Sequence, residues 1–342
     1  MADEELPQAQ PTTSATVPSR AALAAMADLA TPMAIRVAAT LRVADRLPAT
    51  AKELAATIGA DADALDRVLR HLVSAGVLAR ALDSDRYTVT ELGAGLCSDD
   101  PAGLRARWDI EGALGHADLA FVRLLHSVRT GTAAYPELYG VPFWASVSAD
   151  PDRAASFDEQ MGAAVGTVAQ LIVSAYDWGA LGHVVDVGGG NGTLLVAMLT
   201  EYPALRGTVV DLPGPAESAR KMLAAAGLAG RGNAVAGDFF GELPTGAEGY
   251  LLCSVLHHWG DQDARAILRS CAAAAGEDGA VFVIENIADP VDTEQDLRGL
   301  VLFGGGRERD VNELTLLAET AGLTVVAVHT AGTVAIVELA AQ

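Results

Sequence analysis

The feature that most constrains the fold is an alternation of short apolar runs and helical patterns that begins after Trp178. Apolar runs separated by helices are typical of strands that pair in parallel and are covered on both faces. The expected strands span residues 184–187, 208–210, 233–236, 250–256 and 281–284. The second half of the chain is therefore expected to form a parallel α/β sheet that binds a ligand along its carboxyl edge.

A glycine-rich turn follows the first of these strands. Gly188, Gly190 and Gly192 let the backbone pass close to a ligand, and a helix is expected from Thr193, so its amino end follows at once. The spacing G-x-G-x-G differs from the G-x-G-x-x-G of dinucleotide-binding folds. A glycine turn alone is weak evidence, but the strands that follow it add to the signal.

Polar side chains occur where the next strands end. Asp211 ends the second strand, where a carboxylate can accept hydrogen bonds from ribose hydroxyls. Asp238 and Phe239 follow the third strand, where a carboxylate and an aromatic ring suit an adenine base. The fourth strand leads to His257, and the fifth ends in Glu285, an acid that can orient an imidazole. The order of these elements predicts a nucleoside-containing ligand beside a candidate catalytic histidine.

The N-terminal part of the chain carries a different pattern. Residues 1–19 are rich in Ala, Pro, Thr and Ser and are interpreted as a mobile tail. Two helices are expected across residues 23–43, the second beginning at Thr31-Pro32 with the Thr31 hydroxyl as its cap. Both helices are apolar on more than one face, which is typical of helices buried in a partner. We therefore expect a homodimer formed through these helices.

A helix-turn-helix and a β-ribbon follow these helices. Thr50 and Glu53 have capping-box spacing, a second helix begins at Asp61, and Tyr87 and Val89 alternate along a ribbon. This is the order of a winged helix, a fold that often binds DNA. The chain has 44 acidic and 23 basic residues and a net charge of -21, so it lacks the basic surface that nucleic acid requires. A structural or dimerising role is therefore expected.

Composition narrows the class of protein further. No run of about 18 uncharged apolar residues predicts a membrane span, and no secretory signal pattern is present, so a cytoplasmic protein without a membrane partner is expected. The three cysteines, Cys97, Cys253 and Cys271, are widely spaced and indicate neither a disulfide framework nor a zinc site. A soluble enzyme or ligand-binding protein remains.

Residues 106–177 are expected to form a mainly helical linker. This region contains an unusual share of the few large side chains of the sequence, namely Phe143, Trp144, Phe157 and Met161. Two interpretations stay open, a packed helical linker or a wall for a flat apolar ligand.

Together, these motifs resemble the S-adenosylmethionine-dependent O-methyltransferases of the caffeate and polyketide type. The resemblance rests on residues 186–192, 211–213, 237–240, 256–259 and 304–309. Within the family, the chain looks closest to bacterial enzymes that methylate aromatic hydroxyls of polyketide antibiotics and naphthoate-type units. The resemblance implies three parts after the tail: a mostly helical winged-helix dimerisation domain (20–105), a linker lining the acceptor pocket (106–177) and a Rossmann-like class I methyltransferase domain of the α/β class (178–342).

The resemblance also implies the roles of individual residues. His257 would be the general base, and Glu285 and Glu308 would hold its ring. S-adenosylmethionine, without any metal, would be bound by loop and strand-end residues, namely Asp186, Gly188, Gly190, Asp211, Leu212, Gly237, Asp238, Phe239 and Ser254. The acceptor, an aromatic small molecule, would lie near Phe157, Met161, His258 and Phe303.

The chain departs from the family pattern at two positions. His258 stands where the family usually has Asp, which alters an acceptor contact and offers a second imidazole. His257 is kept as the base because it fills the catalytic position of the family, and because neighbours at a strand end point in opposite directions. Cys253 stands where plant relatives often carry a Lys for the cofactor carboxylate, so another donor must serve it. Arg20, Arg298 and His258 are unranked candidates for anchoring the acceptor.

Two other classes of function stay open. Some proteins that resemble this family bind the cofactor but act as hydroxylases or decarboxylases, which the presence of His257 disfavours. A ligand-responsive DNA-binding regulator would need a basic surface that the composition does not supply. The leading prediction is methyl transfer to an aromatic hydroxyl in secondary-metabolite biosynthesis, as in antibiotic pathways.

Overall fold

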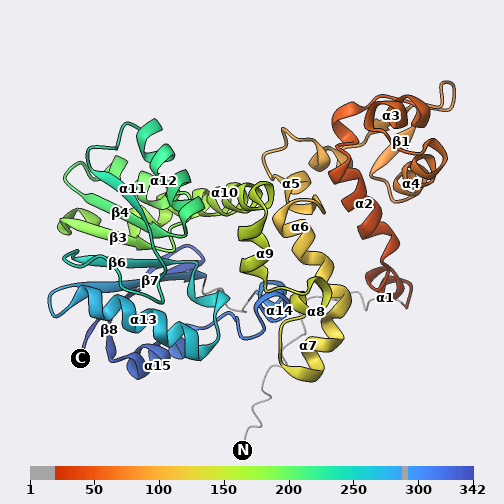
Figure 1. The fold of residues 1–342 in the computed structure, drawn as a ribbon. Helices are drawn as coiled ribbons and strands as arrows, with labels where there is room; N and C mark the ends of the chain where they lie inside the picture. Colours follow the sequence, from red (N-terminus) through yellow and green to blue (C-terminus); the bar gives the residue numbers. More distant parts are fainter. Residues whose placement is uncertain (1–19, 287–291) are drawn as a thin grey trace, which may run out of the picture. The chain divides into compact units, whose positions relative to one another are not determined.

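The computed structural model of the protein describes residues 20–286 and 292–342, so the expected tail lies outside the described residues. Contacts divide the chain into two compact units, the first ending at Cys97 and the second beginning at Ser98. Figure 1 shows the elements of both units. The sequence instead placed this boundary after residue 105, within the first helix of the second unit, α5 (Leu104–Trp108).

The first unit contains helices, turns and one two-stranded ribbon. Its elements are α1 (Arg20–Met26), α2 (Ala30–Thr40), η1 (Ala44–Arg46), α3 (Ala51–Ile58), α4 (Ala62–Ser74), β1 (Leu78–Arg80), β2 (Tyr87–Val89) and η2 (Leu92–Leu96). The expected capping box is present, because the Thr50 hydroxyl accepts from the Glu53 backbone N–H and the Glu53 carboxylate accepts from that of Thr50. The expected order of helix, helix and antiparallel ribbon is also found.

The start of α2 differs from the prediction. The cap is supplied by Asp28, whose two carboxylate oxygens accept from the backbone N–H groups of Ala30 and Thr31, each at 3.0 Å. The expectation that Thr31 caps this helix is therefore wrong. A carboxylate placed before a helix satisfies the same free N–H groups as a hydroxyl and also favours the positive end of the helix dipole.

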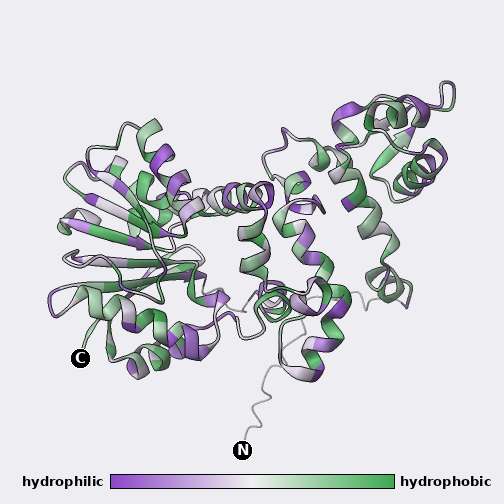
Figure 2. Cartoon of the chain, viewed as in Figure 1, coloured by the Kyte–Doolittle hydropathy of each residue, from purple (hydrophilic) through white to green (hydrophobic). Residues whose placement is uncertain are grey.

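Helices α1 and α2 leave apolar side chains uncovered. Leu23, Met26 and Leu29 are 66%, 78% and 69% exposed, and Figure 2 shows both helices coloured mainly as hydrophobic. Residues 20–40 form the one stretch of the described residues that is long and apolar enough to cross a membrane, judged by length and composition alone. A break with Asp28 in it separates the two helices.

The second unit is built on a seven-stranded sheet with the strand order β5-β4-β3-β6-β7-β9-β8. The strands are β3 (His183–Val187), β4 (Arg206–Asp211), β5 (Gly232–Ala236), β6 (Gly249–Cys253), β7 (Ala280–Asn286), β8 (Leu323–Ala331) and β9 (Val334–Ala341). Strands β5, β4, β3, β6 and β7 pair in parallel in this order, as expected. Strand β9 runs antiparallel to β7, and β8 runs antiparallel to β9. The final antiparallel pair was not foreseen.

Helices cover both faces of this sheet and complete two hydrophobic cores. One core joins the sheet to α13 (Asp261–Ala275) and α15 (Val311–Ala321). The other joins it to α10, α11 and α12. These helices span Pro151–Ala175, Thr193–Glu201 and Pro213–Ala225. The Rossmann-like prediction is confirmed, since a mostly parallel sheet requires cover on both faces.

A helical segment precedes the sheet and carries an aromatic cluster. Its remaining elements are α6 (Ala113–Asp118), η3 (Leu119–Arg123), α7 (Leu124–Thr130), α8 (Tyr135–Tyr139), α9 (Phe143–Ala149) and η4 (Trp178–Ala180). Buried Tyr135 and Phe143 pack against Val301 and Leu302 of α14 (Thr293–Phe303), with Trp144 and Phe157 at the margin. The linker therefore belongs to the same compact unit as the sheet.

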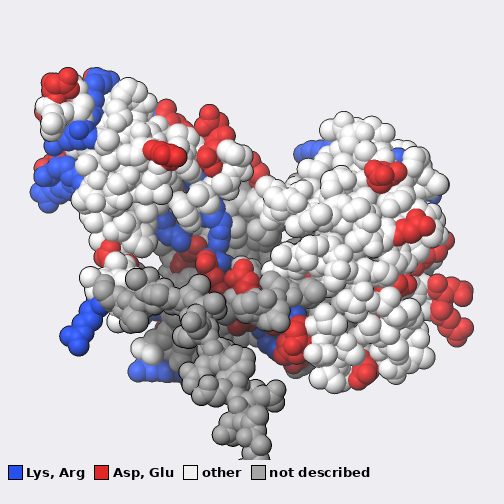
Figure 3. Space-filling view, turned by 180° about the vertical axis from the view of Figure 1, so that it is seen from behind, with Lys and Arg blue, Asp and Glu red and all other residues white. Residues whose placement is uncertain are grey.

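Charged side chains on the sheet-bearing part are mainly acidic on the face that Figure 3 shows. This agrees with the excess of 44 acidic over 23 basic residues.

Replacing Thr50 by Ala tests the capping box of α3. We expect the variant to lose about 1 kcal/mol of local stability, because an N–H at the start of the helix loses its acceptor. Amide hydrogen exchange of residues 51–58 should accelerate by roughly fivefold, which corresponds to that free energy. Exposed Lys52 of the same helix, changed to Ala, is the control and should leave the exchange rates nearly unaltered.

Candidate active site

The parallel strands bring five chain segments to one edge of the sheet. The glycine turn follows β3, Asp211 ends β4, residues 237–239 follow β5, and His257 follows β6. Glu285 is the penultimate residue of β7, the next strand along. Segments far apart in the sequence thus meet at the carboxyl edge, where open α/β sheets bind ligands.

The glycine turn needs residues without a side chain. Gly188, Gly190 and Gly192 have φ values of 72°, 57° and 81°, in the left-handed region that other residues rarely adopt. A Cβ at Gly188 would lie 2.9 Å from Val255 Cγ2 and 3.5 Å from Phe239 Cε1. The turn therefore packs directly on the segments that follow β5 and β6.

Asp211 is tied to the glycine turn. Its carboxylate accepts from the backbone N–H of Gly190 at 2.8 Å and from that of Leu212 at 2.6 Å. Burial raises the pKa of Asp211, although these two hydrogen bonds act in the opposite direction. The side chain is thus held at the end of β4, next to the turn.

A second carboxylate lies beneath the turn without a partner. Asp186 is 1% exposed, and neither of its carboxylate oxygens has a hydrogen-bond partner among the described residues. A Cβ at Gly189 would lie 2.5 Å from this carboxylate. Burial and the charge of Asp211 raise the pKa of Asp186 to about 7. Such a group is costly to bury, so it suits a site that receives a cation or a hydrogen-bond donor.

A third carboxylate comes from helix α10. Burial and the charge of Asp211 raise the pKa of Asp158 to about 6, and Ser218 donates to it at 3.5 Å. The backbone carbonyl of Asp158 accepts from the Asn191 side chain of the glycine turn at 3.2 Å. The sequence did not predict the contact of Asp158 with Asn191. A helix of the linker and the turn between β3 and α11 are brought together only by the tertiary fold.

The residues after β5 form an aromatic corner. The Asp238 carboxylate accepts from the Phe240 N–H at 2.9 Å, which closes a tight turn. Phe239 lies edge-on to Trp259, with ring centroids 5.7 Å apart. Gly237 has no room for a side chain, because a Cβ would lie 2.9 Å from Val210 Cγ1. Ser254, just after β6, has a φ of 56°, a backbone strain that is common at ligand sites.

His257 lies on a short turn and not at the end of a strand. Strand β6 ends at Cys253, and Leu256–His258 form the 3₁₀ turn η5. The argument from strand alternation is therefore wrong, and the His257 and His258 rings in fact lie side by side, with centroids 4.0 Å apart. Burial raises the pKa of the Cys253 thiol far above its ordinary value, which favours the neutral thiol.

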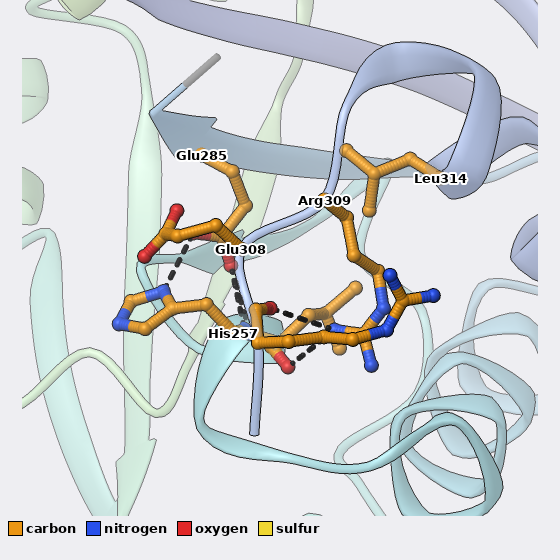
Figure 4. Close-up of a pocket in the computed structure, with 7 residues that line it drawn as sticks. His257, Glu285, Glu308, Arg309 and Leu314 are labelled. Atoms are coloured by element: carbon orange, nitrogen blue, oxygen red, sulfur yellow. Dashed lines mark hydrogen bonds and ion pairs between the residues drawn. The ribbon is translucent and has the colours of Figure 1, made fainter. Parts of the chain in front are cut away.

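Glu285 contacts both the imidazole of His257 and the backbone of the turn that carries it. His257 Nδ1 is 2.7 Å from Glu285 Oε2, while Glu285 Oε1 accepts from the Leu256 N–H at 2.8 Å. Figure 4 shows the carboxylates of Glu285 and Glu308 both directed toward the imidazole, in a small pocket. No hydrogen bond to Nε2 of His257 is found among the described residues, so this atom remains available to a substrate.

The environment of His257 favours its protonated form. Burial acts to lower the pKa of His257, but the charge and hydrogen bond of Glu285 and the charge of Glu308 outweigh it and raise the pKa above 6.5. His258 has the opposite environment. Burial and the neighbouring His257 lower the pKa of His258 well below 6.5, and its ring contacts Trp144 and Phe303 at 5.3 and 4.7 Å between centroids.

Comparison with known proteins identifies this arrangement. An O-methyltransferase domain matches residues 121–324 and an O-methyltransferase dimerisation domain matches residues 23–99. The chain is 52% identical, over 93% of its length and 97% of the relative, to a 2,7-dihydroxy-5-methyl-1-naphthoate 7-O-methyltransferase of Streptomyces carzinostaticus. The chain belongs to the S-adenosylmethionine-dependent O-methyltransferase family. The expected family resemblance is thus confirmed.

Two further similarities bear on the range of this family. The crystal structure of the O-methyltransferase NcsB1 from neocarzinostatin biosynthesis, in complex with S-adenosylmethionine and 2-hydroxy-5-methyl naphthoic acid, matches with a TM-score of 0.90 and 51% identity over 94% of this chain and 98% of that chain. A Streptomyces purpurascens protein, aclacinomycin 10-hydroxylase RdmB, is 45% identical over 90% of this chain and 85% of its own length. Relatives of this chain are thus named for different activities, one for methyl transfer and another for hydroxylation.

The residues present fit the cofactor of this family. S-adenosylmethionine carries a sulfonium and an ammonium group, and the methyltransferase gathers Asp158, Asp186 and Asp211 around the glycine turn with their pKa values raised. A cation near these carboxylates would lower the cost of their ionisation. No group of three or more His, Cys, Asp or Glu side chains suited to a metal ion lies in the described part of the chain.

The acceptor-side candidates are only partly brought together. His258, Phe303 and Phe157 surround Trp144, whose ring stacks on that of Phe303 with 5.5 Å between centroids. Met161 lies one turn further along α10 and is half-buried. Arg298 is an unsuitable anchor, because its guanidinium donates to Asp118 and Glu294, each at 3.0 Å.

Replacing Asp186 by Asn tests the unpaired carboxylate of the methyltransferase. Its folded-state pKa of about 7 lies above the ordinary 3.8, so the folded protein binds a proton that the unfolded chain does not, and stability falls as pH rises from about 4 to 7. At about pH 8 we expect the cofactor-free variant to melt higher than the wild type, by roughly 2–4 °C for each kcal/mol relieved.

Calorimetry would complete this test. At about pH 5 the difference in melting temperature should shrink, because the wild-type carboxyl is then protonated. The variant should also bind S-adenosylhomocysteine more weakly than the wild type. Exposed Glu242, changed to Gln, is the control. An unchanged melting temperature at both pH values would contradict the assignment of a buried unpaired charge.

Proposed function

We propose that this methyltransferase transfers the methyl group of S-adenosylmethionine to a hydroxyl of a hydroxynaphthoate-like aromatic acceptor, with His257 as the general base. The observation that carries the proposal is the His257–Glu285 pair, 2.7 Å apart, beside the glycine turn at the carboxyl edge of the sheet. The naphthoate named for the naphthoate 7-O-methyltransferase and the naphthoic acid bound in the NcsB1 structure support this class of acceptor.

Glu285 determines which nitrogen of His257 can act. A carboxylate within hydrogen-bond distance of Nδ1 favours the tautomer with the proton on Nδ1, which leaves the lone pair on Nε2 to accept a proton. The same carboxylate stabilises the imidazolium after His257 has taken the proton of the acceptor hydroxyl. The pair therefore has the chemistry of a general base with its own orienting acid.

The environment of His257 also lowers the free energy that is needed to move a proton from the acceptor hydroxyl to the imidazole. A phenol with a pKa of about 10 facing an ordinary histidine of about 6.5 loses its proton uphill by roughly 4.8 kcal/mol. The raised pKa of His257 reduces this difference. When bound, the cofactor supplies the methyl group on a sulfonium whose charge favours the phenolate. The chain must also hold the acceptor in place. Such positioning can lower the activation barrier by about 7–11 kcal/mol.

The aromatic side chains and the remaining strand-end residues complete the proposal. Trp144, Phe157, Phe303 and Met161 form the wall for a flat ring, and neutral His258 contacts the polar edge of the acceptor. Asp211 binds the ribose hydroxyls, and Asp238 with Phe239 binds the adenine. Leu212, Gly237 and Ser254 line the cofactor.

The first unit fits an assembly role. The exposed apolar residues of α1 and α2 lie within a segment that the dimerisation domain covers from residue 23. We place a homodimer interface on these helices and the enzyme in the cytoplasm. Burial of that surface in a partner would remove its apolar area from water.

Replacing His257 by Ala tests the base. With radiolabelled S-adenosylmethionine and 1,4-dihydroxy-2-naphthoate, turnover should fall by about 10²–10⁴, the usual contribution of a placed base. Binding of S-adenosylhomocysteine, measured by calorimetry, should stay close to that of the wild type. His329 forms another imidazole–carboxylate pair, with Glu338 at 3.3 Å on β8 and β9, and His329→Ala is the matched control. Wild-type turnover in the His257 variant would refute the assignment.

The same assay separates methyl transfer from the activity of the hydroxylase relative. A wild-type protein that binds the cofactor but labels none of a panel of hydroxynaphthoates and larger polycyclic phenols would contradict methyl transfer. An oxygenated product in the same mixture, detected by mass spectrometry, would then favour hydroxylation.

Replacing Glu308 by Gln tests the charges around the base. The base acts in its neutral form, so kcat/KM should fall as pH drops through the raised pKa of His257, above 6.5. Without the Glu308 charge, this acidic limb should move to lower pH. Exposed Glu277, changed to Gln, should leave the profile in place. A limb that moves to higher pH, or does not move, would contradict the proposed environment.

A further inference from the structure

A buried arginine lies behind the turn that carries His257. Arg309 is 5% exposed, and it is rare for a charged side chain to be so fully covered unless it is paired. Figure 4 shows Arg309 extending away from the His257 imidazole, on the side opposite to Glu308. No role follows for it from the reaction itself, because its donors are directed at backbone carbonyl groups and at the Asp261 carboxylate.

The Arg309 guanidinium spans the two ends of the η5 turn. Nη1 donates to the Leu256 carbonyl at 2.9 Å and Nη2 donates to the Trp259 carbonyl at 2.7 Å. Nε and Nη2 also donate to Asp261 Oδ1, at 3.2 and 2.9 Å. The rigid fork of arginine can serve three acceptors in fixed positions at once, which a lysine ammonium on a flexible stem does less well.

The turn needs such support because it is short. A 3₁₀ turn of three residues has few internal hydrogen bonds, and the backbone here is held from both sides. Glu285 accepts from the N–H of Leu256 and Arg309 donates to its C=O. Two buried groups of opposite charge thus fix the residue that directly precedes His257.

The backbone of the loop that carries Arg309 also packs directly on the turn. A Cβ at Gly306 would lie 2.8 Å from the His257 carbonyl oxygen and 2.9 Å from that of His258. This close approach lets two adjacent residues act on one turn, with Glu308 directed at the ring of His257 and Arg309 at the backbone. The loop and the turn therefore form one unit.

We propose that Arg309 is a positioning residue for methyl transfer, which holds the carbonyl groups at both ends of the His257 turn and so keeps the imidazole between Glu285 and Glu308. The proposal rests on the proposed function of His257. It assigns to this loop a second role besides the presentation of Glu308. Four charged or titratable groups surround the His257 turn: Glu285 from β7 and Glu308 from the loop face the imidazole, Arg309 acts on it through its charge, and His258 from η5 lies beside it.

Two substitutions of Arg309 separate position from charge. Arg309→Lys keeps the cation but cannot hold both carbonyls and Asp261, so kcat should fall about 10–100-fold, as expected for a displaced base. The KM for S-adenosylmethionine should change little, but the acidic limb of the pH profile should move to lower pH, because a displaced imidazole loses the carboxylates that raise its pKa. Arg309→Met also removes the cation, so its acidic limb should lie at higher pH than that of Arg309→Lys, because a neighbouring positive charge no longer opposes protonation of His257.

A third variant perturbs the turn without touching Arg309. Gly306→Ala places a methyl group against the carbonyls of His257 and His258 and should lower kcat in the same range as Arg309→Lys, with cofactor binding retained. Arg269 donates to the Thr320 carbonyl at 2.9 Å on the surface, so Arg269→Lys is the matched control and should keep wild-type kinetics. Titration of the His257 imidazole by NMR gives a readout that is independent of turnover.

The outcomes distinguish the two proposals. A wild type that does not methylate refutes the proposed function, and the NMR titration of His257 still tests whether Arg309 sets its environment. Wild-type kcat in Arg309→Lys, or an unmoved His257 titration in the same variant, overturns the positioning role. A lower melting temperature in Arg309→Lys, together with losses of both kcat and cofactor affinity, also overturns it. Such a combined loss would mark a residue that is needed only for folding.

Discussion

The parallel pairing of β6 with β7 is the constraint on which the rest of the site depends. Its register places Cys253 opposite Ile284, and the Ser254 N–H donates to the Ile284 carbonyl at 2.9 Å. The chain leaving β6 is therefore level with Glu285 at the carboxyl edge. A shift of one residue would turn Glu285 to the opposite face of the sheet, where it could not reach the His257 turn. The buried cores on both faces fix this register.

Ionisation of the buried carboxylates around the glycine turn is costly, and a bound cation can lower that cost. Asp158, Asp186 and Asp211 lie close enough for the Asp211 charge to raise the pKa values of the other two. A protein selected for stability alone would not bury Asp186 without a partner. The glycine turn above this carboxylate leaves room only for backbone, so relief comes from a ligand or a proton and not from a side chain. Ligand binding and stability are thus linked through the same group.

The sequence predicted the elements whose causes are local. The capping box of Thr50 and Glu53, the strand that ends at Asp211, the strand that carries Glu285 as its penultimate residue, and the glycine turn all depend on residues near one another in the chain. The start of α2 differs from the prediction because the helix begins at Ala30, where Asp28 accepts from the N–H groups of Ala30 and Thr31, and two plausible caps cannot be ranked by spacing. Asp158 and Arg309 could not be predicted, because their partners lie on distant segments.

The two adjacent imidazoles illustrate why position in a motif is insufficient to assign a base. His257 and His258 lie on one turn with rings 4.0 Å apart, so strand geometry does not separate them. Their surroundings do, because two carboxylates face His257, whereas Trp144 and Phe303 face His258. The pKa of the first is raised and that of the second lowered. Protonation of His257 disfavours protonation of His258, so the first proton goes to the imidazole on the carboxylate side. Electrostatic surroundings thus favour His257 for proton transfer and leave His258 a neutral polar group facing the aromatic wall.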